Sequence, residues 1–125
     1  MFGPERLLQE LLEIGYAAEP RRAGDLEFVV ITNYLIQMGR FQDRVIDLGL
    51  PGTPDFPRSV GSSIHVRATP QLIETQNVPN VMNIIASPLG ADWRYWSHNF
   101  NWEGERERSG ARLLAQVNTI FARVP

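Results

Sequence analysis

Hydrophobic positions recur with a helical period at both ends of the chain. Residues 5–16, ERLLQELLEIGY, place leucines three and four positions apart between charged residues, which is the pattern of an amphipathic helix. Pro4 suits the first turn of this helix and Gly15 suits its end. Residues 111–124, ARLLAQVNTIFARV, repeat the pattern, with Ser109 as the expected N-cap. The sequence therefore predicts an N-terminal and a C-terminal helix, each with one apolar face.

The middle of the chain has the composition of β-strands. Residues 26–36, LEFVVITNYLI, are too apolar for simple alternation and predict a strand that is covered on both faces. A turn at Gly39 and a second strand over residues 44–50 complete an antiparallel hairpin, and residues 64–69, IHVRAT, predict a third strand. Between the second and third strands, residues 51–63 contain three prolines and predict a long structured loop.

Three further segments have weaker patterns. The polar EPRRAGD segment, residues 19–25, separates the first helix from the first strand and is assigned no element, and residues 70–83 are interpreted as a loop. MNIIASPLG, residues 82–90, indicates either a short strand or a buried connection. The expected fold is α+β and forms a single domain over residues 1–125. It has an N-terminal helix, an antiparallel three- to four-strand meander, a Pro-rich loop region and a C-terminal helix.

Composition excludes several classes of function. The net charge of −2 gives no basic stripe for nucleic acid, and no apolar run is long enough to cross a membrane. The N-terminus has no signal-peptide pattern, so we expect a cytoplasmic protein. The chain contains no cysteine. It also contains no lysine, since all twelve of its Lys and Arg residues are arginines. Thiol nucleophiles, disulfides, thiolate metal ligands and Schiff-base amines are therefore excluded.

The segment WRYWSHNFNW, residues 93–102, concentrates the aromatic residues of the chain. Trp93 and Trp96 would share a face if this segment were helical, and such residues most often belong to a core. Large aromatic residues in a polar segment are also typical of binding hot spots. We expect at least one tryptophan to be buried. The candidate binding residues are Trp93, Trp96, His98, Asn99 and Trp102.

Candidate chemistry is confined to a few side chains. His98 is either a general base, with Ser97 and Asp92 as its candidate partners, or a structural residue that bonds buried backbone groups, which is the interpretation we favour. His65 faces away from Ile64 and Val66 and is predicted to lie at the surface or at a sheet edge. No metal site or cofactor is expected, because a zinc site would have to be completed by carboxylates such as Asp92 or Glu103.

Two segments resemble the ubiquitin-conjugating (E2, or UBC-like) fold. LPGTPDFP, residues 50–57, is similar to the proline loop with an aromatic-proline pair by which E2 strands leave the sheet. SPLGADWRYWSHNFNW, residues 87–102, resembles the signature of a bacterial family often called prokaryotic E2 family E. The positions that carry it are Leu89, Gly90, Trp93, Trp96, Ser97 and His98, although the family's histidine usually comes one residue later. The resemblance covers most of the chain.

The resemblance implies a role in a bacterial ubiquitin-like modification system, since family members occur beside genes for ubiquitin-like proteins, E1-like enzymes and JAB-type peptidases. Ala86 stands about where an ordinary E2 places its cysteine, so thioester transfer by this chain is excluded. Ser87 is able to form an oxyester only with an adjacent base, and none is evident nearby in the sequence. Asn80 is similar to the asparagine of the E2 His-Pro-Asn element, which we interpret as coincidence or relic.

The leading hypothesis is a noncatalytic E2-like protein that acts by binding. Its expected partners are a ubiquitin-like modifier, an E1-like enzyme or a target, and neither nucleic acid nor membrane. One alternative is an enzyme with a non-cysteine centre around His98. Another is an interaction domain unrelated to ubiquitin, in which the E2-like architecture is only an analogy.

Overall fold

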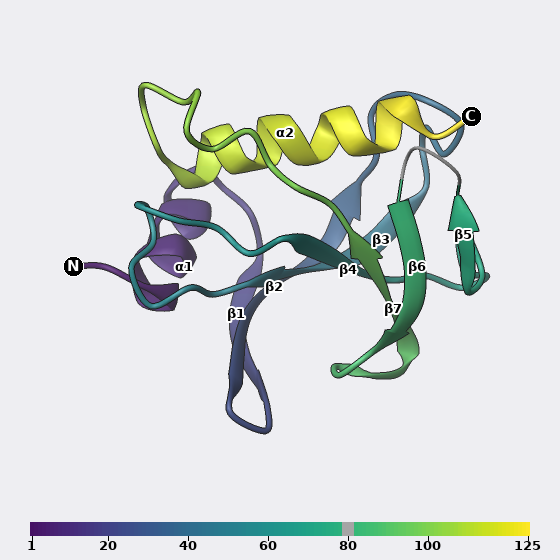
Figure 1. The fold of residues 1–125 in the computed structure, drawn as a ribbon, viewed down its shortest axis with the longest axis horizontal. Coiled ribbons are helices and arrows are strands. Elements are labelled where there is room, and N and C mark those ends of the chain that lie inside the picture. Colours follow the sequence, from purple (N-terminus) through teal and green to yellow (C-terminus); the bar gives the residue numbers. More distant parts are fainter. Residues whose placement is uncertain (79–81) are drawn as a thin grey trace.

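The computed structural model describes residues 1–78 and 82–125, which form two helices and a single antiparallel sheet (Figure 1). The elements are α1 (Pro4–Glu13), β1 (Ala18–Ala23), β2 (Leu26–Leu35), β3 (Val45–Pro51), β4 (Ser63–Arg67), β5 (Gln76–Val78), β6 (Met82–Ser87), β7 (Gly90–Ser97) and α2 (Gly110–Arg123). The α+β class is confirmed. Neither helix in these ranges is long and apolar enough to cross a membrane.

Both predicted helices are confirmed. In α1, Pro4 occupies the first turn, and the buried Leu7 and Leu11 lie one turn apart on the same face. In α2, the side chain of Ser109 accepts a hydrogen bond from the backbone N–H of Arg112, as expected for the N-cap. The buried face of α2 consists of Leu113, Leu114, Val117, Ile120 and Phe121.

The first four strands form a meander in chain order. The hairpin predicted from residues 26–50 is β2–β3, and the predicted third strand is β4. A strand at Ala18–Ala23 was not predicted, and it pairs with β2 along its whole length. Its polar composition is explained by its position: β1 is an edge strand, where Pro20 and exposed charged side chains are tolerated.

The second half of the sheet contains more strands than the sequence predicted. The strand order is β1-β2-β3-β4-β7-β6-β5, so the sheet has seven strands rather than three or four. The segment from Gly90 to Ser97 is a strand that pairs with both β4 and β6. Residues 82–87 form a strand, which was one of the two alternatives for that segment. The loop predicted for residues 70–83 is wrong at Gln76–Val78 and Met82–Asn83, which are strands, and Asn80 lies outside the described residues.

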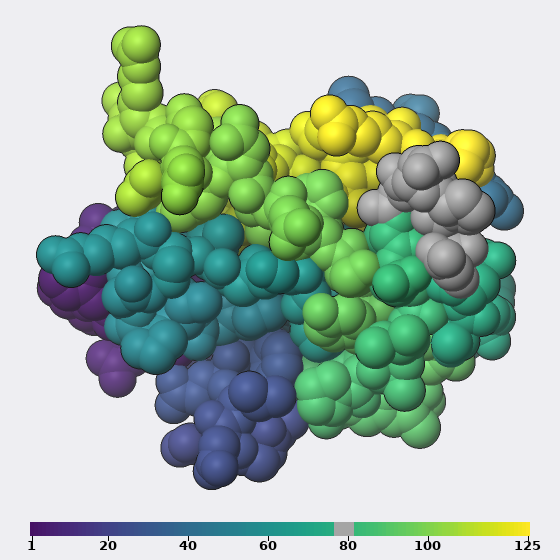
Figure 2. Space-filling view, in the orientation of Figure 1, coloured from purple at the N-terminus to yellow at the C-terminus, as the bar shows by residue number. Residues whose placement is uncertain are grey.

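The two helices pack on one face of the sheet and contribute to one apolar core. Leucines from both helices pack there with alternate residues of the strands, such as Leu48 of β3 and Ile64 of β4. Figure 1 shows α2 lying across this face, with α1 at the end that carries the β1–β2 side. In the space-filling view (Figure 2), the β1–β2 and β6–β7 hairpins project away from α2. The opposite face of the sheet, which we call the helix-free face, has a different composition.

Candidate functional site

The helix-free face carries a second buried cluster, separate from the main core. A row of paired positions crosses it from Val30 through Gly49 and His65 to Tyr95. Gly49 leaves room for this packing, since a Cβ atom there would lie 2.8 Å from the Cδ1 atom of Leu89. The buried members that lie outside the main core are Phe28, Val30, Ser63, His65 and Trp93. The apolar character of β2 on both of its faces follows from this second layer.

His65 lies at the centre of the helix-free face. Its side chain faces away from Ile64 and Val66, as predicted, but its prediction as a surface or edge residue is wrong, because only 2% of it is exposed. The reason is twofold: β4 lies between β3 and β7 and is not an edge strand, and side chains of neighbouring strands cover the ring on this face. Phe28 and Tyr95 contact the imidazole edge-on, with ring centroids 4.9 and 5.2 Å away.

Both ring nitrogens of His65 lie within hydrogen-bond distance of serine hydroxyls. The Nδ1 atom lies 2.7 Å from the Oγ atom of Ser87, and the Nε2 atom lies 3.1 Å from the Oγ atom of Ser63. The backbone N–H of Leu89 also donates to the Ser87 hydroxyl, at 3.1 Å. Ser63 is buried with His65, whereas Ser87 is half-buried at the start of the β6–β7 turn. The three side chains form a connected chain of hydrogen bonds.

Burial lowers the pKa of His65 from 6.5 to about 4, because the charged imidazolium loses its hydration at this position. The ring is therefore neutral at physiological pH, with one nitrogen that donates and one that accepts. Either tautomer fits, since each serine hydroxyl can donate or accept. A neutral ring with an accepting nitrogen beside a hydroxyl is the basic form of a histidine.

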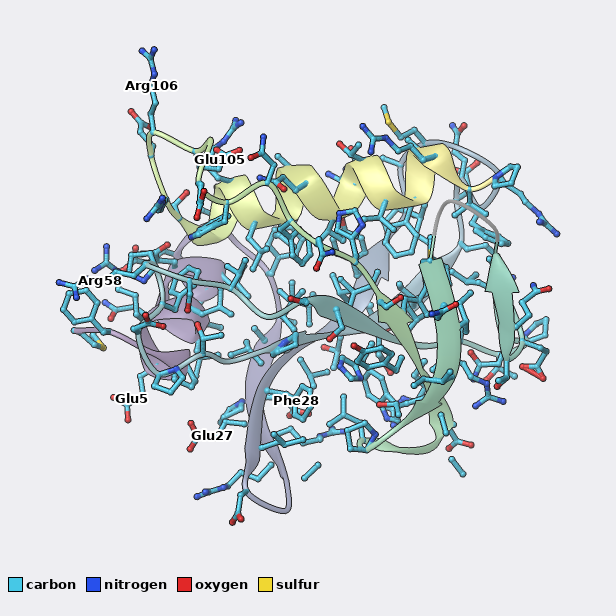
Figure 3. All side chains as sticks on the ribbon, in the orientation of Figure 1. Glu5, Glu27, Phe28, Arg58, Glu105 and Arg106 are labelled. Atoms are coloured by element: carbon cyan, nitrogen blue, oxygen red, sulfur yellow. The ribbon has the colours of Figure 1, made fainter. Side chains whose placement is uncertain are left out.

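A cavity of about 470 Å³ opens beside His65 on the helix-free face. Its walls combine apolar groups, including Leu26, Phe28 and Tyr95, with the polar groups of Ser63 and His65. A second cavity of about 530 Å³, next to α1, shares Glu27, Phe28 and Pro54 with the first. Figure 3 labels Glu5, Glu27 and Phe28, which line the cavity beside α1. The two cavities adjoin at their three shared residues, and each has a volume typical of a small-ligand site.

Trp93 closes the other end of the buried cluster. Its ring contacts two guanidinium groups: that of Arg67 lies 4.8 Å and that of Arg21 lies 5.8 Å from the ring centroid. Arg67 is held in place by Asp47, whose carboxylate accepts from the Nε and Nη2 atoms at 2.9 and 2.7 Å. The contact between Arg21 and Trp93 joins the β1–β2 hairpin to β7 across the helix-free face.

The tryptophans predicted as binding residues are all buried, as at least one was expected to be. Since the segment is a strand, Trp93 and Trp96 point to opposite faces and do not share one. Trp96 packs in the main core against Phe121, and the indole N–H of Trp102 donates to the carbonyl oxygen of Pro57 at 2.7 Å. Their rings therefore stabilise the fold and are covered in this conformation, whereas Asn99 is exposed.

The structure does not bring His98, Ser97 and Asp92 together. Ser97 accepts a hydrogen bond from the backbone N–H of Asn83 at 2.8 Å. Asp92 is exposed five residues earlier on the same strand, which places it about 16 Å away. The ring of His98 is half-buried and packs edge-on against Phe100, and burial together with Arg123 lowers its pKa. In the described part of the chain, no three acidic or histidine side chains are grouped as a metal site would require.

Sequence reasoning missed the pair formed by His65 and Ser87. The two residues are 22 positions apart, and their contact depends on β7 pairing between β4 and β6. One partial signal was present: Ser63 and His65 are two positions apart on a strand and therefore share a face.

Comparison with known proteins adds no assignment: no family model, curated protein or solved structure matches this chain.

Proposed function

We propose that this chain acts by binding, as an E2-like component of a bacterial ubiquitin-like modification pathway. Its partner would be the modifier, an E1-like enzyme or a target. The proposal draws on the sequence resemblance at residues 50–57 and 87–102 and on the absence of cysteine, which excludes thioester transfer. The order of α1 and the β1–β4 meander, with the proline loop between β3 and β4, is compatible with a UBC-like fold. The additional strands β5–β7 extend that pattern.

The observation that carries a binding role is the cavity on the helix-free face. It is open, largely apolar and lined by a few polar groups, which is the usual character of a ligand site. Leu26, which is 54% exposed, lines this cavity, and the cavity beside α1 adjoins it. An extended segment of a partner, such as the C-terminal tail of a small modifier, fits a cavity of this kind better than a folded surface does.

A binding measurement with two matched variants tests the proposal. The modifier and the E1-like protein encoded beside this chain would be titrated into it by calorimetry. Leu26→Asp should weaken binding at least about tenfold, because it places a charge in the apolar wall of the cavity. Leu35→Asp is the control: Leu35 is at the other end of β2, is 47% exposed and does not line the cavity.

Two results would overturn this function. The first is the absence of binding to any neighbour-encoded protein, which would favour an interaction domain unrelated to ubiquitin. The second is equal loss of binding in both variants, which would move the interface away from the cavity.

A further inference from the structure

We propose that Ser87 is a nucleophile that accepts an acyl group from an activated ester or thioester, with His65 as its general base. The inference goes beyond binding and does not depend on the identity of any partner. It places the candidate chemistry on the helix-free face, and not at His98 of the aromatic segment.

The geometry is that of an activated hydroxyl. A serine becomes a useful nucleophile when a base lies within hydrogen-bond reach and a third group orients that base. Here the Oγ atom of Ser87 lies 2.7 Å from the Nδ1 atom of His65, and Ser63 bonds the opposite nitrogen at 3.1 Å. When the Nε2–H donates to Ser63, the Nδ1 atom is left as the acceptor that faces Ser87. Phe28 and Tyr95 hold the ring in this orientation from two sides.

The surroundings provide both space and a hydrogen-bond donor. Ser87 is half-buried, and the next residue, Pro88, lines the 470 Å³ cavity together with Ser63, His65 and Tyr95. Ser87 itself does not line the cavity, but its base His65 and its neighbour Pro88 do, so an acyl chain held in the cavity would lie next to both. The backbone N–H of Leu89 lies 3.1 Å from the Ser87 Oγ atom. When that oxygen turns toward a carbonyl carbon, the N–H becomes available to the developing oxyanion.

The reaction balances without a further reagent. The Ser87 oxygen attacks the carbonyl carbon of R–CO–X, where X is a thiolate or an activated alkoxide, and its proton passes to the Nδ1 atom of His65. The tetrahedral intermediate then expels X, which takes the proton from the imidazolium. The products are the Ser87 acyl ester and H–X, and the imidazole is restored to its neutral form.

Acylation with p-nitrophenyl acetate tests the inference. The whole chain would be incubated with the reagent, and release of p-nitrophenolate and the intact mass would be followed, with peptide mapping of the modified residue. The chain has no lysine or cysteine, so the background from amines and thiols is confined to the N-terminus. We expect one acetyl group on Ser87, and a rate that falls through a single limb near pH 4, where the imidazole becomes protonated.

Four variants decide the roles. Ser87→Ala should lose the modification, and Ser87→Cys should be acylated, which shows that the position is open even if the alanine variant is poorly folded. His65→Gln should lower the rate at least about 100-fold and remove the pH limb. Thr119→Ala, which removes an exposed hydroxyl on α2, should leave both the rate and the limb unchanged. Acylation of the Ser87→Cys variant without acylation of the native serine would overturn the role of His65, and modification of neither would overturn the site.

A small ester reports on Ser87 alone, so this result and the binding result are separate. If Ser87 is not acylated, the proposed binding function is unaffected. If no neighbour-encoded protein binds, the proposed role of Ser87 as a nucleophile is unaffected.

Discussion

Both faces of the sheet carry a buried layer of side chains, but the two layers differ in composition. Under the helices the layer is largely apolar, with residues such as Leu48, Ile64 and Trp96 buried in the main core. Its main polar exception is the Tyr34 hydroxyl, which donates to Asn118. On the helix-free face the layer contains an imidazole, two serine hydroxyls, one of them half-buried, and a tryptophan covered by arginines. Burying polar groups costs free energy unless they are hydrogen-bonded, and apolar side chains would fill this layer without that cost. The comparison therefore separates a face that holds the fold together from a face that is suited to function.

The largest difference in stability between the two faces is expected for substitutions at the two tryptophans of β7. Trp96→Ala should destabilise the fold by about 3–5 kcal/mol, because it opens a cavity in the main core beside Phe121. Trp93→Ala should cost less, about 2 kcal/mol, because Arg21 and Arg67 are able to move into the space or into solvent. Urea unfolding of both variants measures the difference, and equal losses would show that the two faces contribute alike.

Acid should act on the helix-free face through His65. Its pKa is about 4 in the folded protein and 6.5 ordinarily, so below pH 6.5 the unfolded chain binds a proton that the folded chain does not. Stability is therefore retained above pH 6.5 and falls as the pH drops from 6.5 toward 4. The expected loss between pH 7 and pH 5 is about 2 kcal/mol.

The His65→Gln variant is the control for this pH effect, since it lacks the imidazole of residue 65 but keeps every other titrating group of the wild type. The wild-type free energy of unfolding should fall by about 2 kcal/mol more than that of the variant between pH 7 and pH 5. Parallel pH curves for the two proteins would contradict the burial of a neutral imidazole.

The smallest of these effects is expected at Asp47. This carboxylate accepts two hydrogen bonds from Arg67 and a third from the backbone N–H of Asn33 at 3.2 Å. Asp47→Asn removes the charge of a half-buried pair and should cost about 1 kcal/mol, less at high salt. Thermal unfolding at low and high ionic strength measures it. A loss that does not depend on salt would assign the effect to packing instead of charge.

The helices and the β2–β3 hairpin were predictable, because their apolar residues follow the pattern that packing against the main core requires. The periodicity of residues 5–16 and 111–124 and the apolar runs of β2 and β3 place α1, α2 and the central hairpin. The edge strand β1 was not predictable in the same way, because an edge strand with solvent on its sides keeps the polar composition of a loop.

The candidate site was harder to predict than the fold. His65 was placed on the correct face of its strand. The apolar run of residues 26–36 indicated that one strand is covered on both faces, but the short segment 64–69 does not show by itself that His65 lies under the same cover. Coverage comes from the insertion of β7 between β4 and β6, which is a long-range pairing. The same pairing brings Ser87 to His65 and sends Trp93 and Trp96 to opposite faces. A spacing of three residues had indicated a shared face only for a helix.

The central claim, that the helix-free face is the functional face, is tested most directly by nuclear magnetic resonance. An isotope-labelled chain would be titrated with the proposed partner, a ubiquitin-like modifier, and the backbone amide shifts would be mapped residue by residue. The account predicts that the largest changes cluster around the cavity, at Leu26, Phe28, His65 and Tyr95. Changes confined to the outer surface of α2, with those four amides unmoved, would contradict it.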